Sequence, residues 1–332
     1  MAAPGLLKKI VTPLFFLLGV SLLVWTIRTI GVAELLGALS FLKGPGLAVL
    51  FFYPMSAIWD AWAWVYSFPA EDRNKITTGG LFWVRLAGEA MNNLTPVADW
   101  GGEPLKARLL KNQYGMTPGG AASGVILAKS VLFYSEVLFW AVGLAPAFAS
   151  SSLAVEWKIG FAAVFVICAV ISVALAIYQK KGFFGSMGRV AARFFPKMAE
   201  SGQTFGGVDA RMSEFYTTPD MFIPSFALHF MGWVVGGVET WLMLIFMGTK
   251  VGLGESLAIE ALLQLARTAT FFVPGNVGVQ EAGLALVFTA FGRPPTHGVA
   301  LSLVKRVRQL LWSGIGLGVW GIYEWKGPRR GE

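Results

Sequence analysis

Long apolar runs recur along the chain, and they limit its possible folds more than any other feature. Six runs are long enough to cross the roughly 30 Å hydrocarbon core of a bilayer as helices: 10–26, 46–68, 118–141, 159–178, 221–247 and 297–323. In hydrocarbon every backbone N–H and C=O group needs an internal partner, which a helix supplies from its own residues. We therefore expect an all-α, polytopic membrane protein with six full spans.

The composition agrees with this class and excludes several others. Hydrophobic residues make up 55% of the chain and charged residues 14%, whereas soluble domains carry about 25% charged residues. A single Cys excludes a disulfide scaffold. The net charge of +8 gathers on no one face and accompanies no nucleic-acid motif. We predict one transmembrane domain over residues 1–332, with no nucleic-acid partner and no cofactor.

Two further segments begin as apolar helices and are then interrupted. Residues 80–112 meet a polar stretch with Pro and Gly at 92–102, and residues 255–292 are broken at 274–278. Irregular backbone at membrane depth survives only where protein or a water-filled cavity satisfies its polar groups. We interpret both segments as re-entrant helical hairpins, each of which enters and leaves the membrane on one side.

The basic residues predict an orientation. With the N-terminus in the cytoplasm, six spans put the basic clusters at 8–9, 73–75, 106–111, 180–211 and 326–330 on the cytoplasmic side. The isolated Arg28, Lys43, Lys158, Lys250 and Arg293 then lie outside. Both termini are cytoplasmic, and the hairpins enter from opposite sides. The basic, aromatic loop at about 179–220 is expected to lie on anionic lipids of the inner leaflet through residues 180–211.

The two broken segments also share a pattern. Each has a Pro seven residues before a Glu, with an Arg upstream: Pro96 and Glu103 with Arg85, and Pro274 and Glu281 with Arg267. Inverted repeats whose broken helices meet near the bilayer midplane are a transporter arrangement, and the breaks mark the binding site. The sequence therefore predicts a substrate site between the two hairpins.

The candidate substrate-binding residues are the polar, charged or helix-breaking residues of these apolar segments. Charges inside a membrane are expensive and usually functional. We expect them to line a cavity for a lipid headgroup, where the cations attract an anion and the carboxylates pair with cations or carry a coupling proton. They are Arg85, Glu89, Asn92, Asn93, Pro96, Asp99, Glu103, Arg108, Lys129, Glu136, Arg267, Pro274, Asn276, Gln280, Glu281, Lys305, Arg306 and Arg308.

Structural roles compete with this interpretation in the hairpins. Arg85 and Glu89 are spaced to form a pair within one helix. Glu103 and Glu281 stand where a second helix should start, where a carboxylate can accept bonds from free N–H groups. Asp99 and Asn276 are ordinary turn residues.

The spans carry alternatives of the same kind. Lys129 and Glu136 lie nearly two turns apart on one face, too far to bond each other, so we expect partners on other elements, the hairpins first. Lys305, Arg306 and Arg308 either line the cavity or snorkel to the outer surface. His229 and His297 are isolated from other ligand-type residues, so we predict no metal site.

Several motifs resemble a known family. Arg85-x3-Glu89-x2-Asn92-Asn93-Leu-x-Pro96, Gly101-Gly102-Glu103-Pro104 and Arg108 resemble the first signature of the flippase-like transmembrane family, which includes the membrane half of bacterial lysylphosphatidylglycerol synthases. Val273-Pro274-Gly275-Asn276-x-Gly278-x-Gln280-Glu281-x-Gly283 resembles the second signature. The stretch 300–308 is similar to the subgroup found in hopanoid biosynthesis loci.

The resemblance implies movement of a modified lipid between leaflets. No aminoacyl-transferase domain follows within the 332 residues, so we expect no synthase activity. Our leading hypothesis is a non-enzymatic, multi-pass flippase of the bacterial inner membrane, with a phospholipid or hopanoid-type lipid as substrate and with homo-oligomerisation open. The alternatives are a membrane-embedded transferase acting on a lipid-linked substrate and a non-transporting scaffold.

Overall fold

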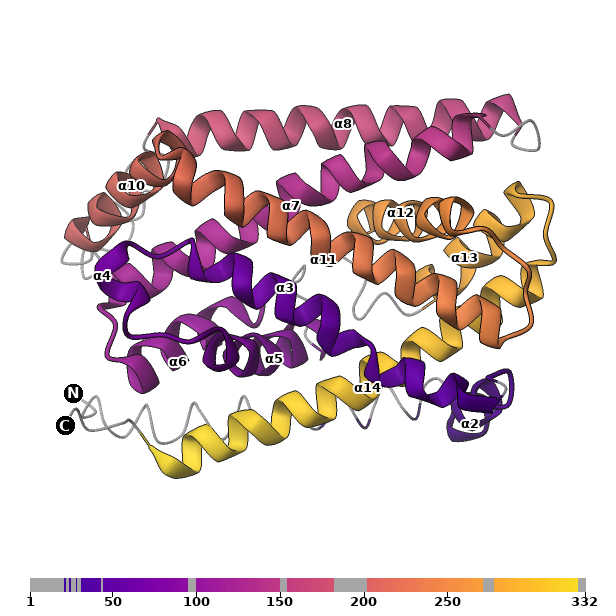
Figure 1. Ribbon diagram of the computed structural model, residues 1–332, viewed down its shortest axis with the longest axis horizontal. Helices are drawn as coiled ribbons and strands as arrows, with labels where there is room; N and C mark the ends of the chain where they lie inside the picture. The colour runs from indigo at the N-terminus through magenta and orange to yellow at the C-terminus, as the bar shows by residue number, and fades with distance from the viewer. Residues whose placement is uncertain are drawn as a thin grey trace.

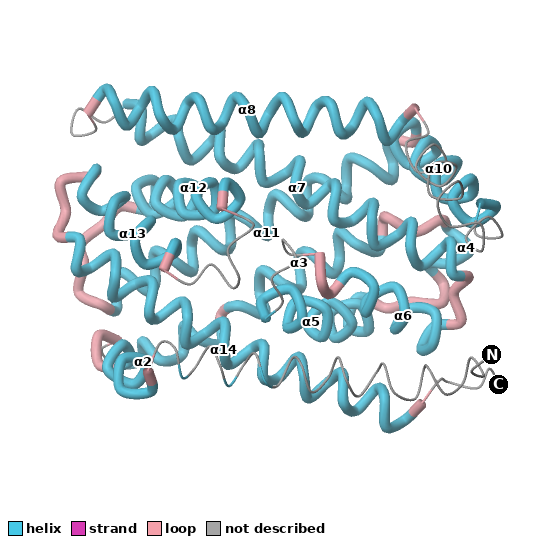
Figure 2. The backbone as a smooth tube through the Cα atoms, turned by 180° about the vertical axis from the view of Figure 1, so that it is seen from behind, coloured by secondary structure: helices cyan, strands magenta, loops and turns pink. Residues whose placement is uncertain are grey.

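The computed structural model describes residues 31–42, 44–94, 100–149, 154–181, 202–270 and 278–327, together with residues 21, 24 and 28. Throughout this part of the chain the regular structure is helical, without strands, as predicted (Figure 2). The helices are α2 (Val32–Leu39), the 3-10 helix η1 (Gly44–Phe51), α3 (Tyr53–Val65), α4 (Ala70–Arg73), α5 (Thr78–Leu94), α6 (Glu103–Tyr114), α7 (Pro118–Ala149), α8 (Val155–Lys180), α10 (Gly202–Thr217), α11 (Pro219–Phe246), α12 (Leu253–Ala269), α13 (Val279–Ala290) and α14 (Pro295–Lys326).

Four helical segments in the described residues are long and apolar enough to cross a membrane. They are Gly46–Val65, Pro118–Ala145, Val155–Lys180 and Pro219–Phe246. The predicted span at 297–323 lies within α14, whose 32 residues suffice in length but include Lys305, Arg306 and Arg308. The predicted span at 10–26 lies outside the described residues. An all-helical membrane protein is thus supported, while the number of spans stays a prediction.

Each broken segment folds as a pair of packed helices. In the first, α5 and α6 meet at their outer ends, where a Cβ at Gly80 would lie 2.1 Å from the Tyr114 hydroxyl. In the second, Arg293, three residues after the end of α13, donates from Nη2 to Glu255 Oε2 of α12 at 2.7 Å. In each helical hairpin the first and last residues therefore lie close together. Figure 1 shows the two hairpins entering the bundle from opposite ends.

Helix α14 runs along both hairpins and packs on each through a glycine. A Cβ at Gly298 would lie 2.4 Å from the Leu284 carbonyl oxygen of α13, and one at Gly316 would lie 2.4 Å from the Leu86 carbonyl oxygen of α5. Small residues allow such close backbone approach between membrane helices. The backbone of α14 thereby holds the inverted hairpins in one framework.

The buried apolar residues form a separate cluster around each hairpin. One contains Leu81, Val84 and Leu109 of the first hairpin with Trp320 of α14. Another contains Ile259, Leu262 and Phe288 of the second hairpin with Leu301 of α14. Charged side chains gather between these two clusters, and they form the candidate site.

Candidate functional site

A cavity of about 460 Å³ lies between the two hairpins. Residues of α3, α5, α7, α8, α11, α12, α13 and α14 line it, together with Trp100 before α6, and we call it the central cavity. Its charged lining is Arg85, Lys129, Arg267, Lys305 and Arg308 among the cations and Asp60, Glu89, Glu136, Glu239 and Glu260 among the carboxylates. Five positive and five negative charges balance, so the central cavity is charge-neutral when all of them are ionised.

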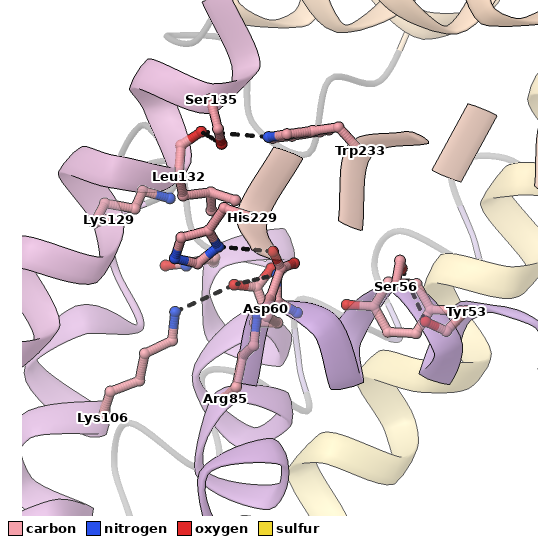
Figure 3. Close-up of polar contacts among 12 residues, drawn as sticks. Tyr53, Ser56, Asp60, Arg85, Lys106, Lys129, Leu132, Ser135, His229 and Trp233 are labelled. Carbon is pink, nitrogen blue, oxygen red and sulfur yellow. Dashed lines mark hydrogen bonds and ion pairs between the residues drawn. The ribbon is translucent and has the colours of Figure 1, made fainter. Parts of the chain in front are cut away.

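On the side of the first hairpin, Asp60 of α3 joins two other helices. The Arg85 Nη2 of α5 donates to Asp60 Oδ2 at 2.7 Å, and the His229 Nδ1 of α11 lies 2.8 Å from Asp60 Oδ1. Figure 3 shows the Asp60 carboxylate between these two side chains. A Cβ at Gly232, one turn along α11 from His229, would lie 2.9 Å from Asp60 Oδ1. The Gly at position 232 therefore leaves room for this carboxylate.

From Arg85 the charges alternate in sign through the first hairpin. Arg85 lies 4.0 Å from Glu89, and the Lys106 ammonium of α6 lies 3.2 Å from both Glu89 and Glu103. The Lys129 ammonium of α7 then lies 3.7 Å from Glu103. Because removing charges from water is costly unless they are paired, this alternation lets six ionised side chains, from Asp60 to Lys129, share a largely buried region.

Asn92 fixes the turn of the first hairpin. Its Oδ1 accepts a hydrogen bond from the Gly102 N–H at 2.6 Å, and its Nδ2 donates to Glu103 Oε1 at 3.1 Å. A Cβ at Gly102 would lie 1.9 Å from the Gly88 carbonyl oxygen. The start of α6 therefore lies directly against α5, which brings Glu103 and Lys106 into the series of alternating charges.

On the side of the second hairpin, Lys305 of α14 is buried with a carboxylate. Its ammonium donates to Glu260 Oε2 of α12 and to Thr240 Oγ1 of α11, both at 2.7 Å. The Glu260 carboxylate also accepts hydrogen bonds from Thr240 at 2.6 Å and from Gln264 at 2.8 Å. Both charged groups of the Lys305–Glu260 pair therefore have further hydrogen-bond partners besides each other.

Glu281 both caps a helix and pairs with a cation. Its Oε2 accepts a hydrogen bond from the Gly278 N–H at 2.7 Å at the start of α13, so the capping role is present. Its Oε1 lies 3.2 Å from Arg306 Nη2 and accepts a hydrogen bond from Ser302 Oγ at 3.1 Å. The two interpretations of Glu281 are therefore compatible.

Lys305, Arg306 and Arg308 of α14 point into the protein, and each of these three has a carboxylate partner. Arg308 pairs with Glu239 of α11, and its guanidinium lies 5.2 Å from the centre of the Tyr53 ring. With Lys305 on Glu260 and Arg306 on Glu281, none of the three needs to snorkel to a surface. Lys305 and Arg308 line the central cavity, whereas Arg306 is not among its lining residues.

Other predicted site residues fall in three groups. Arg85, Glu89, Asn93, Lys129, Glu136, Arg267 and Gln280 line the central cavity. Arg108 does not, because it pairs at 2.7 Å with Glu324 near the end of α14. Pro96, Asp99, Pro274 and Asn276 lie outside the described residues.

The expected partners of the α7 charges lie on the hairpins. Lys129 contacts Glu103 of the first hairpin, and Glu136 Oε1 accepts a hydrogen bond from Thr268 Oγ1 of the second at 3.5 Å. Arg267 also lines the central cavity, and it has no side-chain ion-pair or hydrogen-bond partner among the described residues.

Some lining residues were absent from the predicted set. Asp60, Glu239 and Glu260 are carboxylates within apolar helices, which is the signal that identified Glu136. The aromatic lining residues Trp233 and Trp312 carry no such signal, because aromatic side chains are common on membrane helices whichever way they face.

Comparisons with known proteins support the resemblance to the membrane region of lysylphosphatidylglycerol synthases. A family model described as "Lysylphosphatidylglycerol synthase TM region" matches residues 11–318. A "UPF0104 membrane protein" of Methanothermobacter thermautotrophicus is 26% identical over 247 residues, which cover 68% of this chain and 70% of that protein. No solved structure matches the chain.

Proposed function

The chain belongs to the family of lysylphosphatidylglycerol synthase transmembrane regions, and from this premise we propose that it moves a lipid or lipid-linked molecule between leaflets. The headgroup passes through the central cavity while the acyl or terpenoid tails stay in the bilayer. A phospholipid and a hopanoid-type lipid are the candidate substrates, and the bacterial inner membrane is the proposed location.

One observation carries the proposal: a charged cavity of about 460 Å³ between two inverted helical hairpins. A polar headgroup crosses hydrocarbon slowly because its desolvation costs several kcal/mol. Paired charges inside the protein replace that lost hydration along the route. Because the cavity is neutral overall, its ion pairs can exchange partners with an entering headgroup at a smaller cost than breaking isolated pairs.

The arrangement of loops supports the proposed orientation. The end of α3 with α4, the end of α6 with the start of α7, the end of α8 with α10, and the end of α14 lie at one end of the bundle in Figure 1. They include Arg73, Lys111, Lys180 and Lys326, whereas Lys250 follows α11 at the other end. By the positive-inside rule, the first end is cytoplasmic. The hairpins then re-enter from opposite sides. The residues that flank each break line the cavity: Asn93 and Trp100 in the first hairpin, and Thr268 and Gln280 in the second.

The test measures lipid movement in proteoliposomes with a variant that fills the cavity. Gly236 of α11 lines the central cavity, and a Cβ there would have open space around it. Gly236→Leu should place an isobutyl group in the cavity without a clash. We expect the wild type to move fluorescent phosphatidylglycerol between leaflets and Gly236→Leu to fall to the rate of protein-free vesicles.

Gly318→Leu is the matched control, because Gly318 is exposed on α14 and also has open space. It should keep the wild-type rate. If wild-type protein moves none of a panel of phospholipids and hopanoid-type lipids, the proposed function is wrong. If Gly236→Leu moves lipid normally, the assignment of the route to the cavity is wrong. Mass spectrometry of the same lipids would reveal a transferase instead, through a covalent addition to the lipid.

A further inference from the structure

His229 is a buried imidazole with one nitrogen engaged and the other unengaged. The side chain is 3% exposed, and its Nδ1 faces the Asp60 carboxylate at 2.8 Å. Because an ionised carboxylate only accepts hydrogen bonds, Nδ1 carries the proton. In the neutral ring Nε2 is then the basic nitrogen, and it has no hydrogen-bond partner among the described residues. The contact with Asp60 therefore leaves Nε2 as the atom that can take up a proton.

A second cavity of about 30 Å³, here called the small cavity, lies beside His229. About 10–15 Å³ is enough to hold one water molecule, so the small cavity has room for a proton carrier. It shares Asp60, Arg85, Glu89, Lys129 and Leu132 with the lining of the central cavity. His229 thus adjoins the proposed lipid route without lining it.

The charged groups around His229 come from four of the surrounding helices. They are Asp60 of α3, Arg85 and Glu89 of α5, Glu103 and Lys106 of α6, and Lys129 of α7. No charged residue of the described part of α12 lines the small cavity; its Glu260 is held by Lys305. Three carboxylates and three cations cancel. A proton on His229 would therefore leave this buried group with one uncompensated positive charge.

The added charge would act on the Asp60–Arg85 ion pair, whose Arg85 has a second carboxylate within reach. Protonated His229 competes with Arg85 for Asp60, and Arg85 has Glu89 at 4.0 Å as a second carboxylate. A shift of Arg85 toward Glu89 would in turn weaken the hold of Glu89 on Lys106, now 3.2 Å away. Alternatively, an anionic headgroup entering the cavity could compensate the added charge. Both responses favour anion entry when His229 is protonated.

We propose that His229, positioned by Asp60, is a proton-binding site that couples protonation to the entry of an anionic headgroup. This inference rests on the proposed transport function. It assigns the regulation of transport to the six charged side chains that alternate in sign from Asp60 to Lys129. Imidazole suits such a role because it is the side chain that ordinarily changes charge between about pH 5 and 8. His229 acts through Asp60 and Arg85 and is therefore a positioning residue.

The first test is an NMR titration that does not depend on transport. The sequence holds two histidines, so the full-length protein, purified on a tag without histidine and labelled at its imidazole rings, should give two sets of ring signals. His297→Gln assigns them, since His297 is exposed and contacts Thr249 at 3.1 Å. We expect the His229 ring signal to change as the pH is lowered through the range in which imidazoles ordinarily change charge, about pH 8 to 5, and Asp60→Asn to alter that change. A His229 ring whose signal is unchanged across this range would refute the proton site.

The second test measures movement of fluorescent phosphatidylglycerol in proteoliposomes. Rates are compared between about pH 5.5 and about pH 7.5, a range in which imidazoles ordinarily change charge. We expect the wild-type and His297→Gln rates to fall as the pH rises, and the His229→Gln rate to be independent of pH. A His229→Gln protein with the wild-type pH profile would overturn the inference while lipid movement itself still stood. If no lipid moves at any pH, the proposed function fails, and the NMR titration still decides whether His229 binds a proton.

Discussion

Arg85 pairs with Asp60, a residue of another helix, at 2.7 Å, although Glu89 stands one turn away on its own helix at 4.0 Å. The within-helix pair suggested by the sequence spacing is therefore the weaker contact. A buried cation takes the carboxylate that tertiary packing brings closest. The consequence is a link between α3 and the first hairpin.

Asp60→Asn should destabilise the protein strongly. It leaves the largely buried Arg85 with only the weaker Glu89 contact at 4.0 Å, and breaking one side of a buried ion pair costs about 3–5 kcal/mol. The free energy of unfolding in detergent by denaturant titration measures the loss. Lys75→Gln is the control, because its pair with Asp72 involves a side chain that is 48% exposed; we expect a change below about 1 kcal/mol. Equal effects of the two variants would contradict this account.

Lys305 and Glu260 should behave as a unit. Lys305→Met leaves the Glu260 carboxylate buried without its cation, at a cost of about 3–5 kcal/mol. The double variant Lys305→Met/Glu260→Leu removes both charges and should recover most of that stability. A double-mutant cycle on unfolding free energies gives the coupling. Additive losses from the two single changes would mean that the two residues are not coupled.

The break of the first hairpin should not tolerate a side chain at Gly102. A Cβ there would lie 1.9 Å from the Gly88 carbonyl oxygen, so Gly102→Ala must push α5 and α6 apart, at about 1–3 kcal/mol. Gly79→Ala, in the same hairpin, meets no atom within 4 Å and should be neutral or stabilising. The midpoints of thermal unfolding in detergent compare the two. A Gly102→Ala protein as stable as wild type would refute the close approach.

Arg267 should matter for lipid movement more than for folding. It lines the central cavity and has no ion-pair partner among the described residues, so Arg267→Gln strands no carboxylate of that part of the chain. A lost hydrogen bond between a charged group and the substrate is worth about 1.5–3 kcal/mol, which corresponds to about a tenfold or greater loss in transport rate for an anionic lipid. Lys250→Gln, an exposed change outside the cavity, should leave the rate unchanged. An Arg267→Gln variant that unfolds easily would instead point to a structural role.

Much of the architecture could be predicted from local sequence. The breaks near 95–102 and 270–278 separate helices α5 from α6 and α12 from α13, as expected from their Gly, Pro and Asn content. The predicted ends of the apolar spans differ from the helix ends in the structure by several residues where apolar character changes gradually along the sequence. Helix α7, for example, continues to Ala149, beyond the predicted end at 141, and the apolar run at 46–68 divides into η1 and α3.

The candidate site was predicted in part. Carboxylates and cations inside apolar segments pointed to Glu89, Lys129 and Lys305, which do line the cavity. Arg108, which the family signature pointed to, pairs with Glu324 away from the cavity. Sequence spacing identifies a buried charge without identifying its partner, because the partner is commonly many residues away.

The sequence by itself determined the membrane class, the helical structure and the positions of both breaks, because these depend on apolar length, backbone satisfaction and turn residues that act within a few residues. Only the tertiary structure decided which charges meet. The pairing of Arg85 with Asp60, of Lys305 with Glu260 and of Asp60 with His229 depends on which helices are neighbours. That choice is made by packing, since Coulomb attraction in a low-dielectric interior acts on the nearest unscreened partner whatever its distance along the chain.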